Sequence, residues 1–245
     1  MNLTLKDIYA RKSVRVYEDK PIGAEEKRAI LEAAIQAPTA GNMGLFSIID
    51  ITDQELKNKL AETCDHQPFI AKAPMALAFC VDYQRWYDAF CAHEDQVRVP
   101  AEGDYMLAFE DTMIAAQNAV VAAQSMGIGS CYVGDFLERY EIHRELLGLP
   151  KYVMPAVLIA FGYPNEQQRN RVKPPRFAVE DVVCENKYER KTGEEFMDML
   201  KKRHGLDGED FDRWMSAFCK RKWNCDFSEE MSRSAREMLK AWVEK

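Results

Sequence analysis

Arg11-Lys12-Ser13-Val14-Arg15 is the stretch on which the interpretation of this chain depends. In extended backbone the side chains alternate between two faces, so Arg11, Ser13 and Arg15 share one of them. Two guanidinium groups and a hydroxyl on one side are suited to gripping a phosphate. Taken alone, the stretch also fits a solvated basic turn after a short helix, because most short basic runs lie on the surface. The surrounding sequence has to decide between the two.

The composition predicts a folded protein with a small-molecule partner. The chain has 245 residues, 47% of them hydrophobic, which is enough for one sizeable core or one core with an appendage. A net charge of -7 lacks the basic footprint that nucleic-acid binding needs, so no nucleic-acid partner is expected. Charged and polar residues interrupt the longest apolar stretch, and residues 1–10 lack a signal-peptide core. We therefore expect no membrane partner and a cytoplasmic location.

Metal and disulfide chemistry find little support in the sequence. The seven cysteines include no CxxC pair, which favours reduced thiols, and the four histidines are far apart, so no metal site is expected. The chain also has neither a complete GxGxxG nor a GxxxxGK[ST] loop. Rossmann and nucleoside-triphosphate sites are therefore disfavoured.

Periodicity predicts alternating helices and short buried strands. Thr4 and Asp7 form a capping pair that opens a short helix ending near Ala10, and a second helix over 24–37 stops at Pro38. Asp53 is expected to cap a further helix. Short buried strands are expected over 45–51, 75–81 and 157–161.

A long helix is expected over 104–126. Its polar residues recur every seven positions, which leaves one narrow polar stripe and an otherwise apolar surface. Its many alanines are small enough to let another helix approach closely. Such a helix is either the centre of a monomer core or the seam of a dimer. Residues 193–245 have helical stripes too, with Gly205 and Gly208 marking a turn.

Three further segments give the basic stretch its context. They are Ala37-Pro38-Thr39-Ala40-Gly41-Asn42, Gly127-Ile128-Gly129-Ser130-Cys131-Tyr132-Val133-Gly134 and Val172-Lys173-Pro174-Pro175-Arg176-Phe177. In this order and at these separations the chain resembles the nitroreductase family, over about residues 5–188. The resemblance implies an α+β fold with three layers, α-β-α, around a central, mostly antiparallel sheet. It also implies an intertwined homodimer with flavin pockets at the interface. We expect an FMN-binding domain over 1–189 and a helical C-terminal extension over 190–245, packed on the core or on the partner subunit.

The resemblance implies an FMN-dependent oxidoreductase. NADH or NADPH would pass hydride to FMN N5 in a ping-pong scheme, and a nitroaromatic, quinone or flavin would then accept it. Such a scheme needs no protein nucleophile, so no catalytic side chain is expected. Flavin reductases and reductive dehalogenases resemble the same scaffold, and a non-catalytic flavin-binding redox sensor stays open. In the variable-looking segment 82–103, Trp86, Tyr87 and Phe90 form either an acceptor lid or ordinary packing.

The resemblance also implies which residues hold FMN. Its phosphate would be held by Arg11, Lys12, Ser13 and Arg15, joined by Lys173 and Arg176, with Arg171 as an alternative to either of the last two. The turn of Pro38, Thr39, Ala40 and Asn42 has the composition of an ordinary helix-to-strand connection, but in the family it covers the flavin from the other subunit.

Two more parts of the flavin site follow from the same resemblance. Gln67 would approach the flavin ring. The main-chain N–H groups of Tyr132, Val133, Gly134 and Asp135 would face it, since Gly134 permits close backbone approach. Gly44 stands where many members have Gln. Asp135 replaces a small residue, so its carboxylate points away, alters the donor choice or disfavours the anionic reduced ring.

Overall fold

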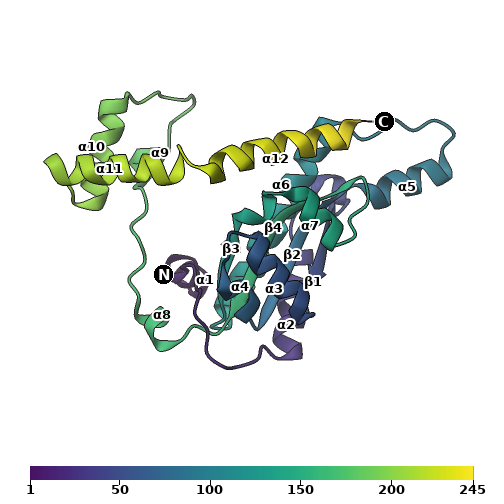
Figure 1. The fold of residues 1–245 in the computed structure, drawn as a ribbon, viewed down its shortest axis with the longest axis horizontal. Coiled ribbons are helices and arrows are strands. Elements are labelled where there is room, and N and C mark those ends of the chain that lie inside the picture. The colour runs from purple at the N-terminus through teal and green to yellow at the C-terminus, as the bar shows by residue number, and fades with distance from the viewer. Residues whose placement is uncertain (245) are drawn as a thin grey trace. The chain divides into compact units, whose positions relative to one another are not determined.

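Residues 1–171 are built around a sheet of four antiparallel strands (Figure 1). The computed structural model describes residues 1–244. The strands lie in the order β1-β2-β4-β3 and are β1 Phe46–Asp50, β2 Met75–Asp82, β3 Gly129–Val133 and β4 Val153–Gly162. A parallel bridge between Ser13 and Ser130 adds the N-terminal segment to the β3 edge. The sheet is therefore mostly antiparallel, as expected.

Helices cover both faces of the sheet. Every residue of β2 and β4 is buried, because alternate side chains enter two different cores. Leu77 and Ile159 belong to the core beneath α2 (Ala24–Ile35) and α6 (Glu102–Ser125). Ala78 and Leu158 belong to the core beneath the other layer, which contains α3 (Gln54–Thr63) and α4 (Pro68–Lys72). This arrangement confirms the expected three-layer α-β-α fold.

The remaining elements connect these layers. The helices of the first part of the chain are α1 Leu3–Ala10, α5 Gln84–His93, α7 Tyr140–Leu146 and α8 Glu166–Asn170, with 3-10 turns η1 Ala40–Asn42 and η2 Gly134–Leu137. The C-terminal helices are α9 Val179–Val182, α10 Gly193–His204, α11 Gly208–Lys222 and α12 Asp226–Val243. The turn expected at Gly205 and Gly208 lies between α10 and α11.

Helix α6 is the central helix of the core. Ala116 and Ala119 are fully buried against α2 and the sheet. The Asn118 amide donates to the main-chain oxygen of Ala33 on α2 at 3.2 Å, which the small alanines permit. The opposite side of α6 exposes Met106 and Ile114. The alanine face therefore packs within the chain, and the exposed side remains open.

The first helix begins differently from the prediction. Its N-cap is Asn2, whose side chain accepts from the Leu5 main-chain N–H at 2.9 Å. The predicted capping pair of Thr4 and Asp7 is therefore wrong, because Asn2 supplies the acceptor two residues earlier. Asp53 does cap α3, accepting from the Leu56 N–H at 2.7 Å.

Strand β3 was not expected, and a glycine at its start explains how it pairs. Gly127 ends α6 with a φ of 73°, and β3 begins two residues later. A Cβ atom on Gly129 would lie 2.5 Å from Cγ2 of Val14. Only glycine lets the N-terminal segment come this close, and the Val14 N–H then donates to the Ser130 oxygen at 2.9 Å.

The chain divides into two compact units. The first contains residues 1–171 and 230–245, and the second contains residues 172–229. The expected boundary near residue 189 differs from this division. In the second unit Phe211 is buried, and Trp214 stacks on Phe218 with 5.2 Å between ring centroids.

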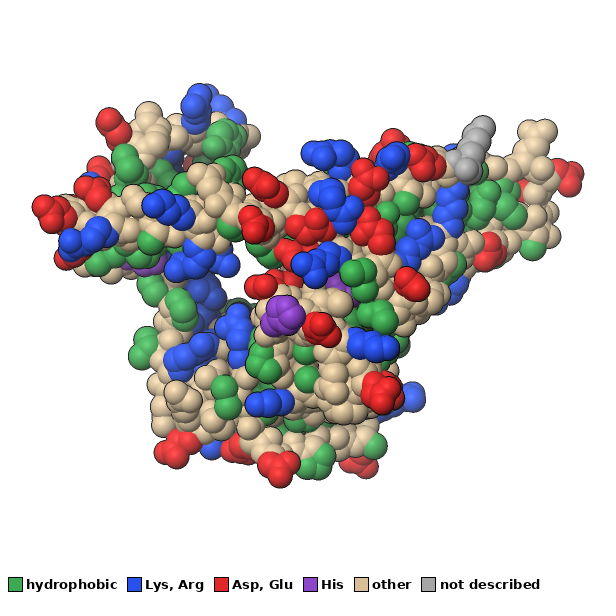
Figure 2. Space-filling model, viewed as in Figure 1, with side chains coloured by type: hydrophobic (Ala, Val, Ile, Leu, Met, Phe, Trp, Pro, Cys, Tyr) green, Lys and Arg blue, Asp and Glu red, His purple; other side chains and the backbone are tan. Residues whose placement is uncertain are grey.

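Most of α12 belongs to the first unit. The Trp242 indole is fully buried, donates to the Ala101 main-chain oxygen at 3.1 Å and meets the Tyr105 and Tyr152 rings edge-on. Arg233 also donates to both carboxylate oxygens of Glu141 on α7, at 2.8 and 3.0 Å. Figure 2 shows basic and acidic side chains intermixed along α12 on the face in view. This part of the expected C-terminal extension is therefore a core element.

None of the helices among residues 1–244 combines the length and the apolar composition needed to cross a membrane. Within the same residues, no three His, Cys, Asp or Glu side chains are placed to hold a metal ion.

Candidate functional site

The basic stretch is extended at the β3 edge. Val14 is buried on one side, while Arg11, Ser13 and Arg15 are partly or fully exposed. Burial raises the pKa of the Cys131 thiol on β3, and Arg15, Ser13 and Arg11 oppose that rise. Arg11 lines a cavity beside α6, whereas Arg15 lies over the Phe69 ring of α4, so the expected common face of Arg11, Ser13 and Arg15 stays a prediction.

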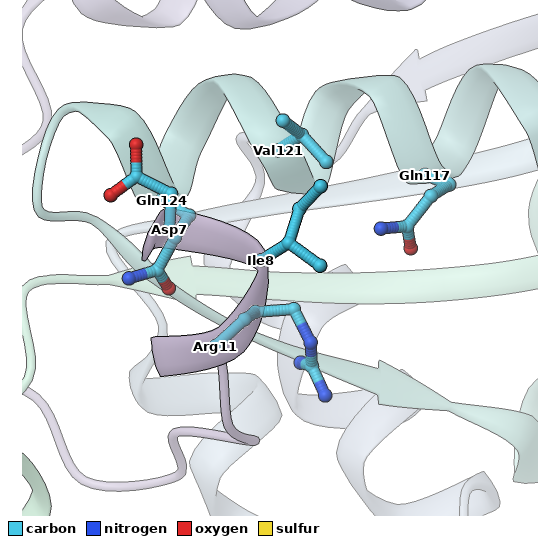
Figure 3. Close-up of a pocket in the computed structure, with 6 residues that line it drawn as sticks. All are labelled: Asp7, Ile8, Arg11, Gln117, Val121 and Gln124. Carbon is cyan, nitrogen blue, oxygen red and sulfur yellow. The ribbon is translucent and has the colours of Figure 1, made fainter. Parts of the chain in front are cut away.

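Arg11 has an unsatisfied donor. Its Nη1 atom is buried and has no hydrogen-bond partner among the described residues. The side chain lines a cavity of about 50 Å³ between α1 and α6, and Figure 3 shows the guanidinium group on the side of the cavity where Gln117 lies. The other lining residues are Asp7, Ile8, Val121 and Gln124.

The wall of this cavity is mixed, because Asp7, Gln117 and Gln124 are polar and Ile8 and Val121 are apolar. The Tyr132 hydroxyl donates to the Gln117 side-chain oxygen at 3.0 Å, and burial raises the pKa of Tyr132 to about 12. A buried donor without a partner costs about 1–3 kcal/mol, so an acceptor at Arg11 Nη1 would be favourable. The cavity holds one polar group and not a flavin ring, since pockets for whole small molecules measure about 300–1,000 Å³. The residues thus fit the polar end of FMN.

Lys12 points the other way. Its ammonium donates to the main-chain oxygens of Arg169, at 2.7 Å, and Arg171. The expected role of Lys12 at the phosphate is not supported by this geometry, because alternation along the segment turns it toward the end of α8. Arg171 donates to the Ser13 main-chain oxygen and so reaches the basic stretch.

Lys173 and Arg176 lie in the second unit. The Arg176 guanidinium donates to the Pro174 oxygen at 3.2 Å. Arg203 from α10 donates to the Pro175 oxygen at 3.1 Å and lies over the Phe177 ring. The joining of Lys173 and Arg176 to the basic stretch stays a prediction.

A second, open cavity borders Arg15. It measures about 580 Å³ and is lined by Arg15, Tyr17, Phe69 and Lys72 among others. Gln67 precedes this wall as the N-cap of α4, and its amide donates to the Cys64 oxygen at 2.9 Å. Its predicted contact with the flavin ring is untested.

Tyr132 and Val133 end β3, and Gly134 and Asp135 begin η2. A Cβ on Gly134 would meet nothing within 4 Å, so the main chain there is open to a ligand. The first N–H groups of a helical turn have no partner within it. The expected approach of the Tyr132, Val133, Gly134 and Asp135 main chain to the flavin stays a prediction.

Glu138 lies just beyond this turn. It is 8% exposed, and its Oε1 has no hydrogen-bond partner among residues 1–244. Burial, together with the carboxylates of Asp135, Asp65 and Glu230, raises the pKa of Glu138 to about 7, and Arg139 opposes the rise. This carboxyl group therefore exchanges its proton near neutral pH.

The turn of Pro38, Thr39, Ala40 and Asn42 lies on α6. Asp111 of α6 accepts from the Thr39 hydroxyl and from the Ala40 N–H, the latter at 3.0 Å. Sequence reasoning missed Asp111 as a site residue, although it placed Asp111 in the polar stripe of the helix. Gln117, which lies in the same polar stripe, was also missed as a site residue.

Helix α5 holds the outer side of this turn. Arg85 donates to the main-chain oxygens of Gly44 and Phe46, at 3.1 and 2.7 Å, and the Trp86 indole donates to that of Met43 at 2.7 Å. Trp86, Tyr87 and the exposed Phe90 thus lie on a helix that contacts the predicted flavin loop.

Known proteins are similar to this chain in sequence and in fold. The family model described as "Nitroreductase family" matches residues 8–163. The NADPH-flavin oxidoreductase of Vibrio harveyi is 32% identical over 193 residues, covering 77% of this chain and 76% of that protein. The FMN reductase [NAD(P)H] of Bacillus subtilis is 32% identical over 181 residues, covering 73% of each.

A solved structure agrees over nearly the whole chain. The NADPH:FMN oxidoreductase from Vibrio harveyi complexed with NAD+ superposes with a TM-score of 0.74 at 29% identity, covering 96% of this chain and 92% of that one. From its fold, the match over residues 8–163 and these relatives, we conclude that this chain belongs to the nitroreductase family.

Proposed function

We propose that this protein is an FMN-dependent oxidoreductase that passes hydride from NADH or NADPH to a nitroaromatic, quinone or flavin. The observation that carries the proposal is the unsatisfied buried donor on Arg11, in the basic stretch where Ser13 and Arg15 would join it at the phosphate. The relatives' names support the cofactor and the donor, since they include an NADPH-flavin oxidoreductase and an FMN reductase.

Different residues of this chain would bind different parts of the cofactor. Arg11, Ser13 and Arg15 bind the phosphate end, where charge-assisted hydrogen bonds contribute about 1.5–3 kcal/mol each. The N–H groups of Gly134 and Asp135 stabilise negative charge at the edge of the ring. When bound, FMN supplies the hydride chemistry itself, so donor and acceptor occupy the same space in turn.

A homodimer would complete the site. Along α6, Asp111 holds the 38–42 turn, whereas Gln117 and Gln124 border the Arg11 cavity. At 1.5 Å per residue these points are roughly 9 and 20 Å apart along the helix axis. The turn and the phosphate grip thus lie at separate points along α6, and we expect the turn to reach the partner's site.

The exposed surface of α1 and α6 supports that assembly. Ile8 on α1 and Met106, Leu107 and Ile114 on α6 are 41–62% exposed. Exposed apolar side chains that cluster on helices are typical of surfaces that bind another protein. A second copy would cover them.

The test is anaerobic titration of the FMN-reconstituted protein with NADH and then NADPH, followed by visible absorption. We expect bound flavin to bleach with at least one donor and to recover when a quinone or nitroaromatic is added. Bound flavin that resists both donors would favour a non-catalytic sensor. Absence of flavin binding would overturn the proposal.

A further inference from the structure

Asp111 is a buried carboxylate with an unusual set of partners. It is 4% exposed in the middle of α6, where an ionised side chain needs donors to offset the loss of water. Its oxygens accept from the Thr39 hydroxyl, from the Ala40 N–H at 3.0 and 3.2 Å, and from the Leu45 N–H at 3.5 Å. Every one of these donors lies in the 39–45 segment.

The Thr39 hydroxyl also joins the two ends of the 39–45 segment. The Thr39 hydroxyl also accepts from the Gly44 N–H at 2.8 Å, so Asp111 and Thr39 together fix both ends of the turn. Between these ends Gly41, Asn42 and Gly44 have φ values of 57°, 58° and 61°. Left-handed backbone at a non-glycine such as Asn42 is uncommon and persists only where the surroundings enforce it.

We infer that Asp111 is the positioning residue that sets the conformation of the 39–45 turn for its contact with FMN. The inference rests on the proposed function, because that function places Pro38, Thr39, Ala40 and Asn42 against the flavin. Asp111 itself lies behind the turn and bonds its main chain. Its effect on the flavin is therefore indirect and is transmitted by Thr39 and Ala40.

The same helix provides a matched control. Asp104 lies seven residues earlier on α6, is 5% exposed, and accepts from the Ala101 N–H at 2.8 Å and from Arg98. It is thus a second buried carboxylate that holds a different loop. Asp104→Asn makes the same chemical change without touching residues 39–45.

The experiment compares Asp111→Asn, Thr39→Val and Asp104→Asn in the full chain. FMN affinity is measured by quenching of flavin fluorescence, and amide hydrogen exchange at residues 40–45 is measured without FMN. We expect Asp111→Asn and Thr39→Val to weaken FMN binding about tenfold and to speed exchange in the turn. Asp104→Asn should stay within about twofold of the parent.

Native FMN affinity and a native visible spectrum in Asp111→Asn would overturn the inference. If that variant fails to fold, amide exchange at residues 40–45 of Thr39→Val without FMN decides, because this variant keeps the carboxylate and removes one of its donors. Unchanged exchange there would also overturn the inference. Failure of the parent chain to bind FMN would remove the proposed function and, with it, the flavin role of Asp111. The exchange measurement would then still show whether Asp111 holds the turn.

Discussion

The Arg15 guanidinium carbon lies 5.7 Å from the centroid of the Phe69 ring, which joins the basic stretch to the start of α4. A cation over an aromatic face is held in place by about 0.5–1 kcal/mol at an exposed site. Arg15 is therefore already oriented toward the open cavity that it lines with Phe69 and Lys72. Because the Arg15 side chain is already ordered, less conformational entropy is lost when a ligand binds.

Arg15→Ala should weaken FMN binding about 10- to 100-fold, because one charge-assisted contact to the phosphate is lost. The measurement is flavin retention after dialysis, with the dissociation constant taken from fluorescence quenching. Arg28→Ala is the control, since Arg28 forms an exposed ion pair with Glu32 on α2. Full flavin occupancy in the Arg15 variant would remove it from the phosphate site.

A mixed dimer should reveal that the 39–45 turn acts on the partner's flavin. One subunit carries Arg15→Ala, the other carries Asp111→Asn, and different tags allow the mixed species to be purified. If the turn acts across the interface, one site combines an intact Arg15 with an intact turn. We expect one FMN per dimer to bind with the parent's affinity.

The number of FMN sites with the parent's affinity differs if each turn serves its own subunit. In that arrangement both sites of the mixed dimer are damaged, and neither binds with the parent's affinity. A dimer of parent and Arg15→Ala chains is the positive control, because it keeps one intact site in either arrangement. A monomeric mass in solution would contradict the dimer itself.

Glu138→Gln should change how stability depends on pH. The folded state raises the pKa of Glu138 to about 7, so it binds this proton more tightly than the unfolded chain does. The resulting stability is present at low pH and is lost as pH rises through 7. Glutamine cannot ionise, so the variant should gain stability relative to the parent between pH 5 and 8, by on the order of 1–2 kcal/mol.

Denaturant unfolding at several pH values measures this difference. Glu145→Gln serves as the control, since Glu145 is an exposed carboxylate on the neighbouring helix α7. Parallel stability curves for the parent and Glu138→Gln would show that the Glu138 proton does not couple to folding.

Two tryptophans of the C-terminal helical region should differ sharply in their effect on stability. Trp242→Ala should destabilise the protein by about 3–5 kcal/mol, because it empties a fully buried site and removes the hydrogen bond to Ala101. Trp223→Ala should change it by less than about 0.5 kcal/mol, since Trp223 is 79% exposed. Thermal unfolding of both variants makes the comparison, and equal losses would contradict the packing of α12 on the core.

Long, regular patterns in the sequence predicted the corresponding elements well. The helix expected over 104–126 is α6, Glu102–Ser125, and the strand expected over 75–81 is β2, Met75–Asp82. Strand β4 begins at Val153, four residues before the predicted start, because Pro155 interrupts the strand pattern. The pairing with β2 shifts register between Phe79 and Cys80, next to that proline. Strand β3 escaped prediction because Gly129 and Ser130 are poor strand formers.

In the candidate site, too, local patterns could be predicted from the sequence and contacts between distant residues could not. Alternation predicted a common face for Arg11, Ser13 and Arg15 from neighbouring residues alone, and it agrees with the burial of Val14 between the less buried Ser13 and Arg15. The contact between Asp111 and Thr39 joins residues 72 positions apart, and no local pattern specifies it. The bond from Arg171 to Ser13 spans 158 positions and is equally invisible in the sequence.

Because the chain leaves the first unit at Arg171 and re-enters it at Glu230, the 172–229 unit is an insertion and not a tail. Cutting the chain after Tyr188 would remove most of the insertion and Trp242 with it, and would leave the aromatic site around Tyr105 and Tyr152 open to water.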